Sequence, residues 1–248
     1  MKMIVPFLSL VFALPVHATI LIDESFESQP AGTRLIDFGP DWFGTTGTFK
    51  VGNTLGLAAT GNQYLEAPSR AGAGSLVRYG WFDASAGFNS RPSGENILLE
   101  SVAMFIPNVT ESTYGGMVMF DQLGDTVAVI GVDMLTGMTL TSATADVNNV
   151  AVNLGQYNNI QLVADYASGL VRYLFNGSLI GSTQMSAASL SAGLGDFDFY
   201  NNGFNATSSV AFRYDDYVIR SVPEPATGAL MVWGLAGLCA VYRRRSAR

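Results

Sequence analysis

The stretch IQLVADYASGLVRYLFNGSLI, residues 160–180, contains three short apolar runs separated by two turn signals. Apolar and polar side chains alternate on both sides of Ala167-Ser168-Gly169, which is the two-residue period of a strand with one buried face. Asn176-Gly177 follows, and Asn-Gly is the dipeptide that most strongly favours a two-residue hairpin turn. This stretch therefore predicts three antiparallel strands joined by two tight turns.

Strand patterns continue outward from this stretch over most of the chain. Residues 97–106 form a long apolar run, and residues 116–122 and 126–133 flank a hairpin turn at Leu123-Gly124-Asp125. Only residues 185–192 have the pattern of a short helix. About ten to fourteen short strands with Gly, Asn and Asp turns predict an all-β protein, an antiparallel β-sandwich or barrel.

Composition limits both the class of protein and its chemistry. The 248 residues are 48% hydrophobic and 13% charged, which is too apolar and too weakly charged for a disordered chain. The only histidine, His17, and the only cysteine, Cys239, lie in apolar segments near the two ends. The body between them has no imidazole and no thiol, so it contains no Ser-His-Asp triad, no Cys-His pair, no zinc site built on these residues and no disulfide.

The N-terminus has the organisation of a secretory signal peptide. Met1-Lys2-Met3 is followed by an apolar run over residues 4–16 and by Val16-His17-Ala18, with small residues at the positions that signal peptidase reads. We expect residues 1–18 to be removed by signal peptidase after Ala18. A buried N-terminal strand or helix is the alternative, although Pro6 and Pro15 suit neither element.

The C-terminus has three parts in a fixed order. Val222-Pro223-Glu224-Pro225 precedes residues 226–242, which are seventeen residues without a charge, and Arg243-Arg244-Arg245 follows. A helix of this length rises about 25 Å, just short of the roughly 30 Å hydrocarbon core of a bilayer. We expect a single transmembrane helix with the arginines on the cytoplasmic side.

This order resembles the PEP-CTERM sorting signal of Gram-negative bacteria, over residues 222–248. The resemblance implies that an exosortase recognises Pro223, Glu224 and Pro225, and that the protein is held briefly in the inner membrane before it reaches the cell surface or the medium. It also implies an association with exopolysaccharide and biofilm. A plain tail anchor is the alternative.

Residues 19–221 remain as an exported β-sandwich body, and this body is acidic. Up to residue 222 it contains eight basic and nineteen acidic side chains, a net charge of −11. A surface of this sign repels phosphate backbones, so we expect no nucleic-acid partner.

The acidic residues of the last strand suggest a calcium site. The apolar alternation of residues 210–219 breaks at Asp215 and Asp216, which predicts a β-bulge that re-aims side chains. If the first and last strands pair, Glu24 or Glu27 lies nearby and adds oxygen ligands for structural calcium. The alternative is that these acids are solvated residues at a sheet edge.

The body is similar to concanavalin A-like jelly rolls of the LamG and lectin/glucanase type. The similarity rests on an opening Asp23-Glu24-Ser25-Phe26-Glu27, a Trp42-Phe43 pair and a closing stretch of residues 214–219. It implies that the first and last strands pair. It also points to carbohydrate as a ligand class, although a fold does not determine a function.

Paired carboxylates are the remaining route to catalysis. Jelly-roll glucanases place acids on one strand in an E-x-D-x-x-E-like pattern, which this chain lacks. Glu95 and Glu100 are five residues apart and face opposite sides of a strand, whereas Asp196 and Asp198 share a face but have no Glu beside them. We therefore expect no catalytic residues and no enzyme, with a divergent glycoside hydrolase as an alternative.

Exposed aromatic side chains beside amides would provide glycan contacts. The candidate rings are Trp42, Phe43, Tyr79, Trp81, Phe82, Tyr200 and Phe204. Tyr200, Asn202 and Phe204 lie in a polar stretch, residues 200–205, that we expect to be an exposed loop, and residues 79–82 are the second candidate for exposure. Core packing is the alternative for each ring. The sequence thus predicts a non-catalytic cell-surface or extracellular-matrix protein, and a lectin-like carbohydrate-binding module is the alternative.

Overall fold

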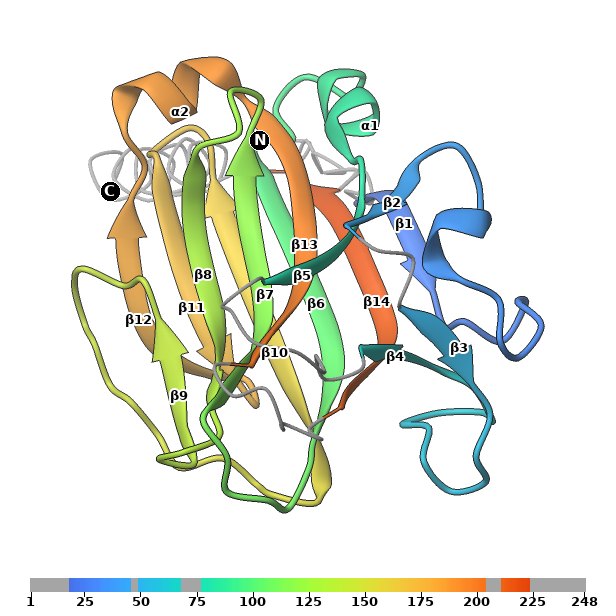
Figure 1. Ribbon diagram of the computed structural model, residues 1–248. Coiled ribbons are helices and arrows are strands. Elements are labelled where there is room, and N and C mark those ends of the chain that lie inside the picture. Colours follow the sequence, from blue (N-terminus) through green and yellow to red (C-terminus); the bar gives the residue numbers. More distant parts are fainter. Residues whose placement is uncertain (1–17, 46–48, 68–76, 204–210, 224–248) are drawn as a thin grey trace, which may run out of the picture.

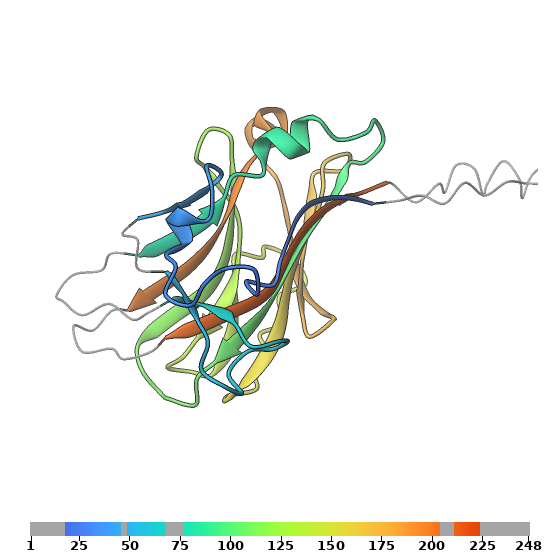
Figure 2. The same ribbon diagram turned by 90° about the vertical axis from the view of Figure 1, so that its right-hand side faces the viewer.

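Two β-sheets packed face to face make up the computed structural model, which describes residues 18–45, 49–67, 77–203 and 211–223 (Figure 1). Seen from the side, the two layers enclose a common interior (Figure 2). The larger sheet consists of β1 (Thr19–Glu24), β3 (Lys50–Gly52), β4 (Tyr64–Ala67), β6 (Ile97–Ile106), β10 (Gln156–Asp165), β11 (Leu170–Phe175), β12 (Ser178–Gln184) and β14 (Phe212–Val222). The smaller sheet consists of β2 (Trp42–Gly44), β5 (Arg78–Phe82), β7 (Thr113–Asp121), β8 (Thr126–Asp133), β9 (Met138–Thr141) and β13 (Leu194–Gly203).

All strand pairs within the two sheets are antiparallel. The eight-stranded sheet has the order β12-β11-β10-β6-β14-β4-β3, with β1 also paired to β14, and the six-stranded sheet has the order β2-β5-β13-β7-β8-β9. Helical segments are short: η1 (Leu35–Asp37), α1 (Ser85–Asn89) and α2 (Ala187–Ala192). The expectation of an all-β antiparallel sandwich with a short helix within residues 185–192 is confirmed, but the expectation that this is the only helix is wrong, because α1 and η1 also form.

The hairpins expected between residues 160 and 180 form β10, β11 and β12. Ile160 pairs with Phe175 and Asp165 with Leu170 across the first hairpin. At the second turn, Asn176 and Gly177 both have positive φ, 49° and 76°, as a type I′ turn requires.

β14, the last strand, pairs with β1, the first strand. Its C-terminal half pairs with β1, with Thr19 opposite Ser221, and its N-terminal half pairs with β4. The register with β6 shifts between Asp215 and Val218. Asp216, within this shift, has φ 50°. The predicted pairing of the first and last strands and the predicted bulge are both confirmed.

Aromatic side chains fill the space between the sheets. Phe199 of β13 lies 4.7 Å from the ring of Tyr214 and 4.6 Å from that of Tyr217, both from β14. The Tyr214 hydroxyl donates hydrogen bonds to the carbonyls of Tyr200 and Gly116, at 2.9 and 3.2 Å, and so links the two sheets. Because side chains alternate along a strand, the residues flanking Phe199 face away from this core.

The predicted terminal segments lie almost wholly beyond the part of the chain that the structure describes. Residues 1–17 and 224–248 are not described, so the signal peptide and the sorting signal stay predictions. Within the described ranges no helix is long and apolar enough to span a membrane, and the predicted helix at residues 226–242 is outside them.

Candidate carbohydrate-binding face

The outer face of the six-stranded sheet gathers polar and aromatic side chains that the core does not use. On β13, Phe197 and Phe199 are 1% exposed and point inward, so Asp198 and Tyr200 point outward. The register places Asp198 opposite Trp81 of β5, and it places Tyr200 opposite Tyr79 of the same strand. Two hollows lie on this face.

The first, which we name the apolar hollow, has a volume of about 400 Å³. Hydrocarbon and phenol groups dominate its walls, and one amide, that of Asn202, adds a polar group. Its lining residues are Val77, Tyr79, Tyr114, Val118, Thr126, Val129, Leu140, Tyr200 and Asn202.

The second, which we name the acidic hollow, has a volume of about 620 Å³. Four aspartates and two aromatic rings stand among its lining residues, which are Trp81, Asp83, Ser85, Phe120, Asp121, Gln122, Gly124, Gly195, Asp196 and Asp198. The ring of Tyr79, from the apolar hollow, contacts the ring of Phe120, from the acidic hollow, edge to face at 6.1 Å. The two hollows therefore adjoin across this ring pair.

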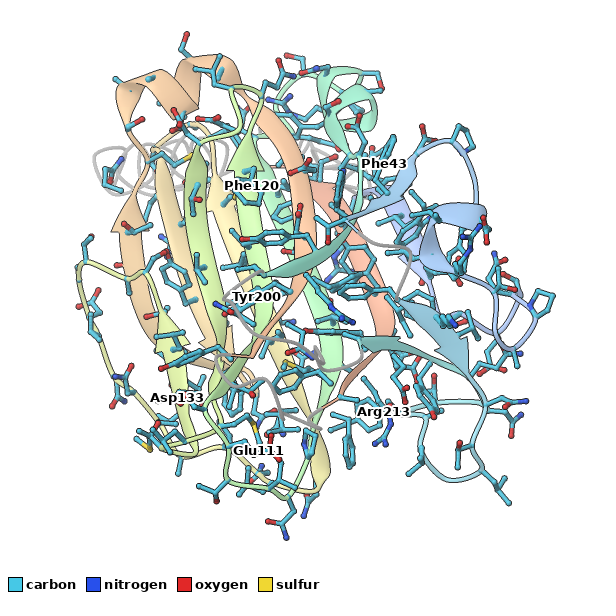
Figure 3. The ribbon with its side chains drawn as sticks, in the orientation of Figure 1. Phe43, Glu111, Phe120, Asp133, Tyr200 and Arg213 are labelled. Atoms are coloured by element: carbon cyan, nitrogen blue, oxygen red, sulfur yellow. The ribbon has the colours of Figure 1, made fainter. Side chains whose placement is uncertain are left out.

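A second ring pair stands beside the acidic hollow. Phe43 of β2 stacks on Trp81 with ring centroids 5.6 Å apart and an interplanar angle of 21°. Phe43 is 40% exposed. Figure 3 shows Phe43, Phe120 and Tyr200 spread over the six-stranded sheet, from three of its strands.

Asp196 and Asp198 form a coupled pair in the acidic hollow. Burial, and after it the neighbouring Asp196 carboxyl, raises the pKa of Asp198 to about 9. Burial also raises the pKa of Asp196, against the effect of its hydrogen bond with Asp198. A pKa of about 9 keeps Asp198 protonated at neutral pH.

The other two aspartates shape the rim. Asp121 accepts hydrogen bonds at Oδ1 from the amides of Leu123 and Asp125, both at 2.9 Å, which fixes the β7–β8 turn. Asp83 accepts one from the amide of Ser85 at 2.9 Å, at the start of α1.

Two of the three predicted glycan contacts lie on this face, but not in a loop. Tyr200 and Asn202 belong to β13, so the expected exposed loop at residues 200–205 is wrong for its described part, and Phe204 lies outside the described residues. Tyr200 is only 7% exposed because its ring lies over Gly131, where any Cβ would collide with the tyrosine hydroxyl. A contact between these residues and a glycan stays a prediction.

The predicted calcium ligands hold a loop of the larger sheet. Glu27 accepts hydrogen bonds at Oε1 from the amides of Asn62 and Gln63, both at 2.6 Å. In the same loop, the backbone amides of residues 59 and 60 donate hydrogen bonds to Oδ2 of Asp215. The hydroxyl of residue 60 donates a hydrogen bond to Asp216. Across the described ranges no three acidic, histidine or cysteine side chains are grouped as metal ligands, and calcium binding here stays a prediction.

The remaining carboxylates considered for catalysis are Glu95 and Glu100. Glu95 accepts a hydrogen bond from the Ser221 hydroxyl. Glu100 faces the core at 0% exposure, where burial raises its pKa well above the ordinary value. Neither side chain lines either hollow.

Sequence reasoning missed Phe120 and Asp121 as members of this face. Phe120 alternates with the buried Met117 and Met119 along β7, so strand period alone indicates that it faces outward. Nothing in the local sequence indicates that Asp121 lies beside β13.

Comparison with known proteins gives likeness in fold only. No protein-family description matches the chain, and no curated protein matches it. Among solved structures, it is similar to a carbohydrate esterase from the Shiga toxin-encoding bacteriophage phi24B, with a TM-score of 0.56 and 13% identity over 83% of this chain and 100% of the other. It is similar to an endo-1,3-beta-glucanase from Streptomyces sioyaensis, with a TM-score of 0.52 and 15% identity over 86% and 99% of the two chains. It is also similar to the CBM2 module of the evolved Dit of Lactobacillus casei BL23 phage J-1, with a TM-score of 0.51 and 10% identity over 85% and 98%.

Proposed function

We propose that the protein is a non-catalytic carbohydrate-binding protein and that the outer face of the six-stranded sheet is its binding surface. The observation that carries this proposal is the set of aromatic rings, Phe43 on Trp81 and Tyr79 against Phe120, beside two adjoining hollows. Flat apolar rings with a few amides and carboxyl groups around them suit a ligand with apolar C–H faces and many hydroxyls.

The solved structures with this fold support the same ligand class. By name, the three compared proteins are a carbohydrate esterase, a glucanase and a CBM2 module. At 10–15% identity these names support a proposal about ligand class and nothing about residues.

The absence of catalysis is part of the proposal. Glycoside hydrolysis uses two carboxyl groups about 5–10 Å apart, one protonated and one ionised, on either side of the scissile bond. Asp196 and Asp198 instead stand two residues apart on one strand and line the same hollow. A divergent hydrolase remains the alternative, and polysaccharide cleavage that disappears in Asp198→Asn would support it.

A glycan array probed with the purified full chain tests the proposal. We expect binding to a subset of glycans, lost in the double variant Phe43→Ala, Trp81→Ala. The matched control is Phe105→Ala, which removes a ring from β6, in the other sheet, beneath the Arg213 guanidinium. Loss of binding in the control as well, or no binding by the wild-type chain, would contradict the proposal.

We further propose that the protein acts outside the inner membrane of a Gram-negative cell, as a surface or matrix protein. The support is sequence alone: the signal-peptide pattern of residues 1–18, the Pro223-Glu224-Pro225 motif and the arginines 243–245. Mass spectrometry of the mature protein from a host with an exosortase tests this. A C-terminus near Glu224 is expected, and a protein that still ends at Arg248 would contradict processing.

A further inference from the structure

We propose that the acidic hollow selects sugars that carry a free amine, so that the protein prefers cationic amino-sugar polymers to neutral or anionic ones. This inference rests on the proposed carbohydrate-binding function and names the ligand class of the same face.

The ionisable side chains that line the acidic hollow are all acidic. Four aspartates line it, and no lysine or arginine stands among its described lining residues. The whole chain has a net charge of −7, which is of the same sign as these carboxyl groups. A uronic acid is therefore repelled from the hollow, and an ammonium group is attracted to it.

Two of these aspartates are buried with an acceptor atom left over. Asp198 is 5% exposed and its Oδ1 has no hydrogen-bond partner within the described residues. Asp121 is 2% exposed, and its Oδ2 also has no hydrogen-bond partner in the described part of the chain. Buried carboxyl oxygens without a donor are costly, and both residues line the acidic hollow. A ligand with several N–H donors satisfies them.

The size and walls of the hollow favour a sugar ring over a metal ion. A volume of about 620 Å³ is far larger than an ion needs, and the described residues show no group of three ligands arranged for a metal. Trp81 and Phe120 line the same hollow. Aromatic faces attract both the C–H face of a sugar and an ammonium group.

Binding of an amino sugar in the acidic hollow should release a proton that can be measured. The charged and titratable groups that interact with Asp198 are Asp196 on its own strand, Tyr79 on β5, and Glu100 and Tyr217 from the larger sheet. None of these is a cation, and Asp198 holds a proton at neutral pH with a pKa of about 9. An ammonium group beside Asp198 favours its ionised form, so binding of the amine releases a proton.

The experiment is a calorimetric titration of the full chain with three oligosaccharides of equal length and linkage. One is built of glucosamine, one of N-acetylglucosamine and one of glucose, each at low and at high salt. We expect the glucosamine oligomer to bind about tenfold more tightly than the other two at low salt, and this preference to shrink at high salt. Titration in buffers of different ionisation enthalpy should show proton release for the amine alone.

Variants assign the preference to the pair of aspartates. Asp198→Asn and, separately, Asp196→Asn should lower the affinity for the glucosamine oligomer to about that for the neutral oligomers. The matched control Asp133→Asn removes one charge at the far end of β8, away from Phe120 (Figure 3), and should retain the preference. If an aspartate variant fails to fold, the proton release of the wild-type chain still decides.

The outcomes separate this inference from the proposed function. Equal affinity for the three oligomers without proton release overturns the amine preference and leaves carbohydrate binding intact. If both Asp198→Asn and Asp196→Asn still prefer the glucosamine oligomer, the assignment of this preference to the acidic hollow is also overturned. Failure of every oligomer, together with a negative glycan array, overturns the proposed function itself.

Discussion

Phe43 and Trp81 are direct cross-strand partners in β2 and β5, and their rings stack on the outer face of the six-stranded sheet. The pairing joins segments on either side of residues 49–67, which lie in the other sheet or in its loops. One ring of the pair is 40% exposed although the core beneath it is closed. An exposed ring held rigid by a second ring is a platform for a ligand and adds little to stability.

The variant Phe43→Ala should weaken glycan binding about three- to tenfold, because it removes one aromatic partner worth about 0.5–1.5 kcal/mol. The free energy of unfolding should fall by less than about 1.5 kcal/mol, since the ring is already part-exposed. Calorimetric titration and denaturant unfolding measure the two quantities. An equal loss of affinity in Phe105→Ala would show that the effect is general.

The variant Asp198→Asn should flatten the dependence of stability on pH. The pKa of Asp198 is about 9 in the folded chain, above its ordinary value of 3.8. Between these values the unfolded chain releases a proton that the folded chain retains, so stability from this group is full below about pH 4 and is lost as pH rises through about 9. Glu100 contributes a dependence of the same sign, because burial raises its pKa too.

At pH 8 we therefore expect Asp198→Asn to unfold at a higher temperature than the wild type, by about 3 °C or more, and the gap to close toward pH 4. Thermal unfolding at several pH values is the measurement, with Asp133→Asn as the control for charge alone. A variant less stable than the wild type at pH 8 would contradict a proton held by Asp198.

The variant Gly131→Ala should destabilise the protein by about 2 kcal/mol and disturb the apolar hollow. A Cβ at this position meets the Tyr200 hydroxyl and the backbone carbonyl of Gly115, and the carbonyl lies in the neighbouring strand and cannot move aside. Gly39→Ala is the control, because nothing lies within 4 Å of a Cβ there and the backbone is unstrained. Unfolding of both variants in denaturant checks this, and equal stability would contradict the contact.

Calcium should leave the thermal unfolding temperature unchanged, because the carboxylates of Glu27 and Asp215 already accept hydrogen bonds from the loop at residues 59–63. Unfolding scans in calcium and in a chelator are the measurement. A rise of several degrees in calcium would instead support the calcium site that the sequence suggests.

Removal of the Glu27 carboxylate should have a larger effect than calcium. The variant Glu27→Ala leaves the amides of Asn62 and Gln63 without their acceptor and should cost about 1 kcal/mol of unfolding free energy. Denaturant unfolding checks this, and a variant as stable as the wild type would show that water replaces the carboxylate without loss.

Features encoded by neighbouring residues could be predicted from the sequence. Of the contacts between distant strands, only the pairing of the first and last strands was predicted, and that prediction came from the resemblance. The hairpin at Asn176-Gly177 and the bulge at Asp215 depend on local chemistry, and both are present. The turn composition of Asn201, Asn202 and Gly203 predicts a loop at Tyr200. Pairing with residues 113–116 of β7 makes this segment a strand.

The candidate site could be predicted from the sequence only to the same extent. Strand period indicates that Asp196 and Asp198 share a face, but not that Asp121 lines the same hollow or that Asp198 holds a proton. Those properties follow from the register of β13 with β7 and β5, which joins segments far apart in the chain. The local pattern of a single sequence is not enough to predict that register.

Hydroxyl-radical footprinting of the full chain, with and without a saturating glycan from the array, tests the binding face most directly. The account predicts that the ligand slows oxidation of the Phe43 and Trp81 side chains several-fold and leaves Phe105, on the opposite sheet, unchanged. Equal oxidation of Phe43 and Trp81 with and without the glycan would contradict the assignment of this face as the binding surface.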